Sequence, residues 1–96
     1  MAMASFTTRV ELHKATDEDY NTLHKAMEKV GFIRTIEANG KTYQMPTAEY
    51  NRIDPGPLRA QKVLNDAKEA ASSTKLKYWI LVTKSLARRF VLDEVR

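Results

Sequence analysis

A cation, a carboxylate and an imidazole stand at alternate positions near the start of the chain, as Arg9, Glu11 and His13. Residues two apart on a β-strand project from the same face, so a strand here would bring the three groups side by side. Metal-independent RNA cleavage uses such a set: a base for the 2′-hydroxyl proton, a cation for the phosphate, and an acid for the leaving oxygen. In this hypothesis His13 is the base or acid, Glu11 is its partner, and Arg9 or Arg34 is the phosphate cation. The alternative is an exposed, salt-bridged strand face.

Other catalytic motifs are absent from the sequence. It has no phosphate-binding glycine loop, no G-x-S-x-G or H-E-x-x-H motif, and no Asp and Glu cluster at metal-ligand spacing. Without cysteine and with only two histidines, a disulfide framework or a usual structural metal site cannot be built. We therefore expect no metal and no cofactor.

Positive charge is concentrated in the second part of the chain. Residues 1–54 carry seven Lys and Arg against eight acids, whereas residues 55–96 carry nine against four. Between Glu69 and Asp93 there are five basic residues and no acid: Lys75, Lys77, Lys84, Arg88 and Arg89. This asymmetry predicts a polyanionic partner, and an ordinary solvated edge is the alternative.

An aromatic pair lies within this basic stretch. Tyr78 and Trp79 follow Lys77, an arrangement typical of platforms on which single-stranded bases stack while cations track the backbone. We therefore predict RNA binding by Trp79 together with the five basic residues above and Arg34. A role of the aromatic pair in the core or in a dimer contact is equally compatible with the sequence.

The elements that must position these residues can be read from periodicity. Residues 6–13 alternate as a half-buried strand, and Thr16 is a good N-cap for a helix that ends before Gly31. In that helix His24 should flank the apolar stripe, with one nitrogen in water. Asn39-Gly40 predicts a two-residue hairpin turn between strands at 32–38 and 41–50, the second ending or bending at Pro46.

The remaining segments complete an α+β pattern. Residues 51–58 are predicted to be a loop, 58–72 a helix and 75–84 a strand, with either a short fifth strand around 89–92 or a tail at the end. The order βαββαβ predicts a ferredoxin-like split, with an antiparallel four-stranded sheet and two helices on one face. The open face should then display Arg9, Glu11 and His13 beside Lys77, Trp79 and Leu81.

Size and composition limit the other possibilities. A chain of 96 residues suits one small domain spanning 1–96, whose ends at 1–5 and 93–96 we expect to be mobile. No apolar run approaches the roughly 20 residues needed to cross a bilayer, and the first residues lack signal-peptide features. We expect a reduced, cytoplasmic setting and no membrane.

Several segments carry a family resemblance. T-x-R-V-E-L-H at 7–13, D-x-D-Y-x-x-L-H-x-A-M at 17–27, G-F-x-R-T-I at 31–36, T-Y-x-M-P-T-A-E-Y-N at 42–51 and I-L-V-T at 80–83 resemble small bacterial proteins grouped with the GhoS antitoxins of type V toxin-antitoxin systems. Membership would imply a ferredoxin-like fold, dimerisation, and a sequence-selective endoribonuclease that destroys a toxin's messenger RNA. The resemblance spans about residues 5–84 and transfers no catalytic residue.

Two functional hypotheses follow. The first is a dimeric RNA-binding protein, and in its stronger form a metal-independent endoribonuclease that acts as an antitoxin. The second is a non-enzymatic homodimeric interaction or regulatory module, in which Trp79, Leu81 and the first strand pair two protomers.

Overall fold

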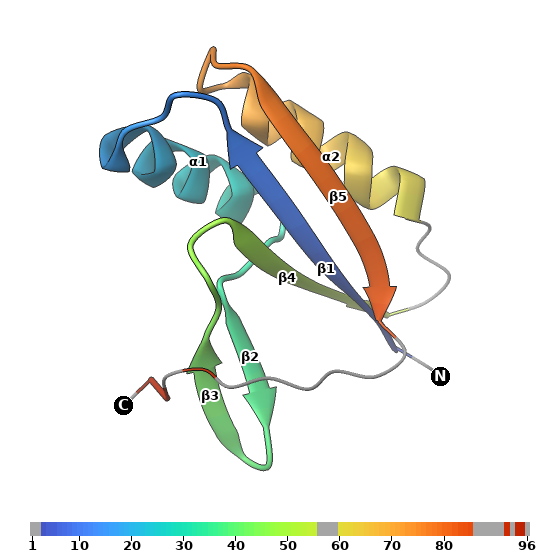
Figure 1. Cartoon of the computed structure of the whole chain (residues 1–96). Helices are drawn as coiled ribbons and strands as arrows, with labels where there is room; N and C mark the ends of the chain where they lie inside the picture. Colours follow the sequence, from blue (N-terminus) through green and yellow to red (C-terminus); the bar gives the residue numbers. More distant parts are fainter. Residues whose placement is uncertain (1–2, 56–59, 86–91, 93, 96) are drawn as a thin grey trace.

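The described residues form two helices and five strands in the order βαβββαβ (Figure 1). The computed structural model describes residues 3–55, 60–85, 92 and 94–95. Its elements are β1 (Met3–Leu12), α1 (Asp17–Lys29), β2 (Thr35–Ala38), β3 (Lys41–Gln44), β4 (Glu49–Pro55), α2 (Ala60–Ser72) and β5 (Tyr78–Ser85). The α+β class predicted from the sequence is confirmed. Neither described helix is long and apolar enough to cross a membrane.

The larger sheet has three antiparallel strands in the order β4-β1-β5. Both helices cover one face of it (Figure 1). Alternate β1 side chains, Phe6, Val10 and Leu12, point to that covered face and are buried. They pack with Leu23 and Met27 of α1 and with buried side chains of α2 and neighbouring segments: Phe32, Tyr50, Val63, Ala67, Ala70 and Ala71.

The predicted four-stranded sheet is not what the described residues form. The hairpin at Asn39-Gly40 is confirmed, with both residues at positive φ, but β2 and β3 form a two-stranded sheet separate from the three-stranded one. What remains of a fourth strand is a single bridge, in which Ile33 and Asn51 exchange backbone hydrogen bonds of 2.8 and 2.7 Å. The backbone then changes partner, because the Arg34 carbonyl already accepts from the Met45 amide.

The segment from Asn51, predicted to be a loop, continues as β4 instead. It pairs with β1 along the register Met3↔Pro55 to Arg9↔Glu49. Continuous pairing with the central strand satisfies the backbone here and outweighs the turn-forming Asp54-Pro55 composition. The same register places residues 3–5 in the sheet, so the expectation of a mobile start does not hold for them.

Near the other end of the chain, the described residues lie against β3. Glu94 forms a bridge with Tyr43, and the Val95 amide donates to the Thr42 carbonyl at 2.8 Å. These contacts differ from the expectation of a mobile end over 93–96. Residues 89–91, where a fifth strand was predicted, lie outside the described residues.

Local signals set the helix boundaries much as predicted. The Thr16 hydroxyl accepts from the Asp19 amide and the Asp19 carboxylate accepts from the Thr16 amide, which is a complete capping box. Gly31 follows α1 at φ +94, a conformation that L residues rarely adopt. The second helix is described from Ala60, and residues 58 and 59, where it was predicted to start, lie outside the described residues.

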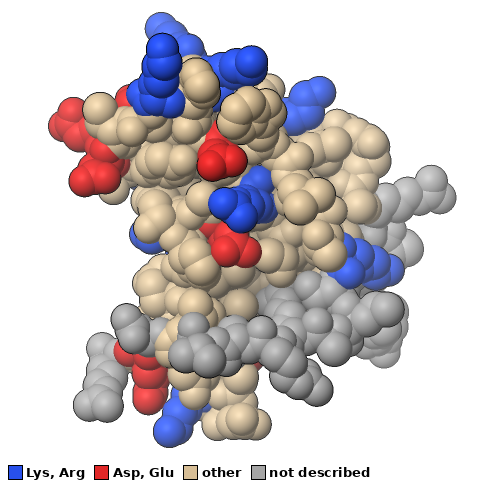
Figure 2. All heavy atoms as spheres, in the orientation of Figure 1, with Lys and Arg blue, Asp and Glu red and all other residues tan. Residues whose placement is uncertain are grey.

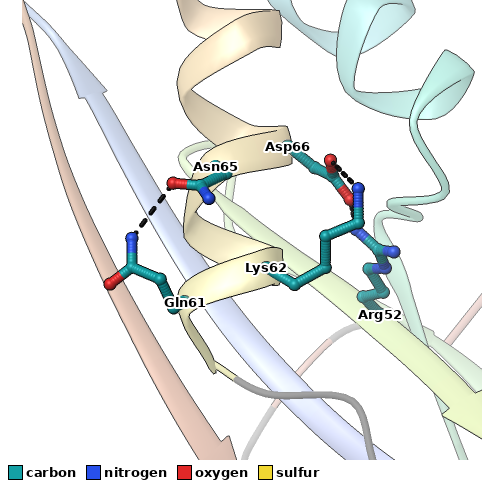
Figure 3. A network of polar contacts seen from close by, with 5 residues as sticks. All are labelled: Arg52, Gln61, Lys62, Asn65 and Asp66. Atoms are coloured by element: carbon teal, nitrogen blue, oxygen red, sulfur yellow. Dashed lines mark hydrogen bonds and ion pairs between the residues drawn. The ribbon is translucent and has the colours of Figure 1, made fainter.

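Three charged side chains on the helix-covered side form one network. Arg52 of β4 donates to the Asp66 carboxylate of α2 at 2.5 Å, and Lys62 reaches the other Asp66 oxygen at 2.9 Å (Figure 3). The Arg52 guanidinium also lies 5.3 Å from the centre of the Phe32 ring. Burial raises the pKa of the Asp66 carboxyl, but hydrogen bonds and charge from Arg52 and Lys62 outweigh it and hold the pKa below its usual value. This network ties α2 to the sheet.

Candidate nucleic-acid interface

The face of the three-stranded sheet that the helices leave open carries the residues singled out from the sequence. In the β1–β5 register, Arg9 stands opposite Leu81 and Glu11 opposite Trp79. Trp79 is 53% exposed and Leu81 is 65% exposed. Figure 2 shows acidic and basic groups next to one another across the middle of the molecule, with Lys and Arg gathered at its upper end. The adjacency predicted between residues 9–13 and 77–81 is therefore present.

Trp79 is the centre of a cluster at the end of this face. The His13 ring meets it edge-on with the ring centroids 5.8 Å apart, and the Lys77 ammonium lies 5.7 Å from the Trp79 ring centre. A hydrogen bond of 2.8 Å from the His13 amide to the Lys77 carbonyl extends the β1–β5 ladder to this point. The backbone thus fixes an exposed aromatic ring between an imidazole and a cation.

Arg9, Glu11 and His13 lie along one line on this face. Arg9 and Glu11 share the open side of β1, while His13 follows the strand end and turns its ring to Trp79. Arg9 stands between Leu81 on β5 and Glu49 on β4 in the register. No hydrogen bond or ion pair joins these three described side chains to one another, so the salt-bridged alternative is not what their geometry displays.

Other predicted RNA-binding residues lie elsewhere. Lys84 stands opposite Phe6 in the register, so its side chain belongs to the helix-covered side of β5. Lys75 is exposed in the turn before β5, at φ +61. Arg34 lies near His24 and Tyr50, whose pKa values its charge lowers. Arg88 and Arg89 lie outside the described residues.

A polar pair on the helix-covered side was not predicted. His24 Nδ1 lies 2.5 Å from the hydroxyl of Tyr50, a fully buried residue to which the sequence analysis gave no role. The Tyr20 and His24 rings are also in contact, with centroids 6.4 Å apart. The spacing Tyr20 to His24 on one helix face was visible in the sequence, and Tyr50 was placed at the end of the predicted strand 41–50. No local signal showed that this strand end contacts His24.

Metal chemistry gains no support from the described residues, since no three His, Asp or Glu side chains among them are grouped closely enough to hold an ion. No family model, curated protein or solved structure matches this chain. Function must therefore be argued from the residues of the open face itself.

Proposed function

We propose that the open face of the β4-β1-β5 sheet binds single-stranded RNA, with Trp79 as the platform on which a base stacks. The observation that carries this proposal is a ring left 53% exposed on a sheet face, flanked by Lys77 and His13. Base stacking on an aromatic ring contributes roughly 1–3 kcal/mol and tolerates any base. An exposed aromatic ring that served only the fold would be buried by it.

Backbone contacts come from the cations beside the platform. Lys77 lies next to the ring and Arg9 stands two positions before Glu11, which faces Trp79 across the strands. Both can neutralise phosphates of a strand that runs across the sheet. Trp79 and these cations come from neighbouring strands, so their spacing is fixed by the ladder.

We further propose that this face can cleave RNA without a metal. His13 would act as base or acid, Glu11 as its partner, and Arg9 would stabilise the charge on the phosphate. The proton of the 2′-hydroxyl passes to the base, the 2′-oxygen attacks phosphorus, and the 5′-oxygen leaves with a proton from the acid. A 2′,3′-cyclic phosphate and a free 5′-hydroxyl result.

The fold and the family resemblance also support a biological role for this activity. The strand order β4-β1-β5 with both helices on one face is compatible with a ferredoxin-like domain whose fourth strand is reduced to the Ile33–Asn51 bridge. With the GhoS-like segments, it supports a cytoplasmic type V antitoxin that acts as a dimer on a toxin messenger RNA.

Binding is tested with short single-stranded RNAs in EDTA over a series of salt concentrations. Because Trp79 is the only tryptophan, its fluorescence reports directly on the platform. We expect RNA to quench it and the affinity to fall as salt rises. Lys77→Gln should reduce the slope of log affinity against log salt by about 0.7. Lys68→Gln, the same charge change on the exposed side of α2, should leave the slope unchanged.

Two results would reject this mode of RNA binding: an affinity independent of salt, or an affinity that Trp79→Ala leaves unchanged when a probe other than tryptophan fluorescence is used. Cleavage is a separate question. We expect His13→Ala to slow it about 100-fold and a 2′-deoxy group at the cleaved position to abolish it. A His13→Ala rate within about threefold of the original would remove His13 from the reaction.

A second candidate function is supported by apolar exposure on the same face. Ile53 is 46% exposed and faces Ser5, and Ile33 is 47% exposed beside Asn51, so both lie on the side of Trp79 and Leu81. Apolar groups gathered on one sheet face suit a non-enzymatic homodimer. Its signature is a dimeric mass together with a blue-shifted Trp79 emission, both lost in Leu81→Lys. A monomer whose Trp79 is quenched by RNA would count against it.

A further inference from the structure

The cluster of His24, Tyr50 and Arg34 lies apart from the open face. Tyr50 is opposite Thr8 in the β1–β4 register, on the side that the helices cover, and is fully buried. His24 reaches it from α1 and is half-buried. The two rings lie 5.6 Å apart at their centroids, so helix and strand fix the imidazole.

The hydrogen bond to Tyr50 sets which nitrogen of His24 is available. Burial strongly raises the pKa of the Tyr50 phenol, so it keeps its proton. A phenol is a better donor than acceptor, and we therefore assign the hydroxyl as donor to Nδ1. Burial lowers the pKa of His24, and the charge of Arg34 lowers it further, so the ring is neutral at pH 7. Because Nδ1 accepts from Tyr50, the neutral ring carries its proton on Nε2. This Nε2–H has no hydrogen-bond partner among the described residues.

Arg34 brings a charge without a counter-ion to this pair, because the antiparallel Ile33–Asn51 bridge sets the next residue, Arg34, beside Tyr50. Its guanidinium has five N–H donors, yet among the described residues none of them meets an acceptor and no carboxylate forms an ion pair with it. Its Nε is enclosed by protein and unpaired. Arg52 differs from Arg34, because its guanidinium forms an ion pair with the Asp66 carboxylate. A partly buried cation without an anion is a costly arrangement unless a ligand supplies the anion.

We propose that Arg34 and His24 form a binding site for a phosphate group, as the free dianion or as a small phosphate monoester. Arg34 offers the planar, charged donors that suit phosphate oxygens, and His24 adds the Nε2–H beside them. Tyr50 is the positioning residue that holds the imidazole. No acidic side chain takes part in the cluster, so a cation would be repelled where a phosphate is attracted.

The two histidines of the chain make NMR of the imidazoles a selective test. The protein is titrated with inorganic phosphate, with a 5′-mononucleotide, and with chloride at matched ionic strength. We expect both phosphates to shift the His24 signals equally in the original protein and in His13→Ala, because the shift does not depend on the open face. Binding should also raise the pKa of His24, because a bound anion favours the imidazolium. Stronger binding of the mononucleotide than of free phosphate would identify a monoester as the ligand, and the reverse the free ion.

Variants separate the site from general charge effects. Arg34→Gln should weaken phosphate binding by about tenfold or more, whereas Lys41→Gln, the same charge change on exposed β3, should leave it unchanged. Tyr50→Phe should keep binding but weaken it, with the His24 signals broadened or displaced before any ligand is added. The proposal is overturned if chloride produces the same shifts, if the His24 shifts are lost in His13→Ala, or if a folded Arg34→Gln binds phosphate as well as the original protein.

Discussion

The two faces of the three-stranded sheet differ in whether their charged side chains are paired and their aromatic side chains buried. On the helix-covered face, Arg52, Asp66 and Lys62 are joined in one network, and the aromatic Phe32 is buried against Arg52 (Figure 3). On the open face, Arg9 and Glu11 have no such bonds, and Trp79 is more than half exposed. The same three strands build both faces.

This difference distinguishes residues that stabilise the fold from residues that are exposed for contact with another molecule. Paired, buried groups on the covered face already have partners within the chain. Unpaired cations and an exposed ring on the open face can gain free energy only from another molecule. Substitutions on the first face should therefore change stability, and substitutions on the second should change binding.

The largest effect is expected for Phe32→Ala. Phe32 is 1% exposed, packs edge-on to Tyr50 and lies under the Arg52 guanidinium, so its removal leaves a cavity at the centre of the covered face. We expect a loss of about 3–5 kcal/mol in the free energy of unfolding. Denaturant unfolding followed by circular dichroism measures it. A loss below about 1 kcal/mol would mean that this face is not the main core.

The next effect concerns Asp66 and pH. Its folded-state pKa lies below the unfolded value, so its stabilising contribution is present above about pH 4 and is lost as pH falls through the folded pKa. Asp66→Asn should cost about 2 kcal/mol at pH 7, because Arg52 loses this carboxylate. The variant should lose less further stability than the original between pH 6 and 3. Equal slopes for both proteins in unfolding experiments across this range would contradict the assignment.

Local signals made much of the fold predictable. The Thr16–Asp19 cap, the Gly31 stop and the Asn39-Gly40 turn depend on a few neighbouring residues, and each is present. The strand residues 51–55 were predicted to be a loop because only pairing with β1 decides their structure, and their partners lie more than 40 positions away. The fourth strand was wrongly extended for the same reason, since nothing local shows that the backbone after Ile33 leaves β4.

The candidate sites divide in the same way. Period-two alternation placed Arg9 and Glu11 on one face, and the βαββαβ order placed Trp79 next to them, so this face could be predicted. The His24–Tyr50 hydrogen bond could not, because it joins residues of two elements 26 positions apart, and no local pattern shows that they meet. Lys84 was counted with Lys77 by proximity in sequence, although alternation along β5 puts the two on different faces.

A smaller effect is expected at the start of α1. Thr16→Ala removes the hydroxyl that accepts from the Asp19 amide, and the lost cap should cost about 1 kcal/mol. Thr16→Asn, which can accept the same hydrogen bond, should recover most of that loss. The pair of variants is compared by thermal unfolding at one pH. Equal destabilisation by both would show that the capping box does not act as a local stabiliser.

The smallest effect on stability is expected for Trp79→Ala, although it removes the largest side chain. With 53% of the residue exposed, little apolar area returns to water, and we expect a loss below about 1 kcal/mol, part of it from lower strand propensity. RNA binding should fall in the same variant, by about tenfold or more if stacking contributes as proposed. Circular dichroism replaces fluorescence as the unfolding probe. A loss as large as that of Phe32→Ala, growing with protein concentration, would instead place Trp79 in a dimer interface, since only a stabilising partner makes unfolding depend on concentration.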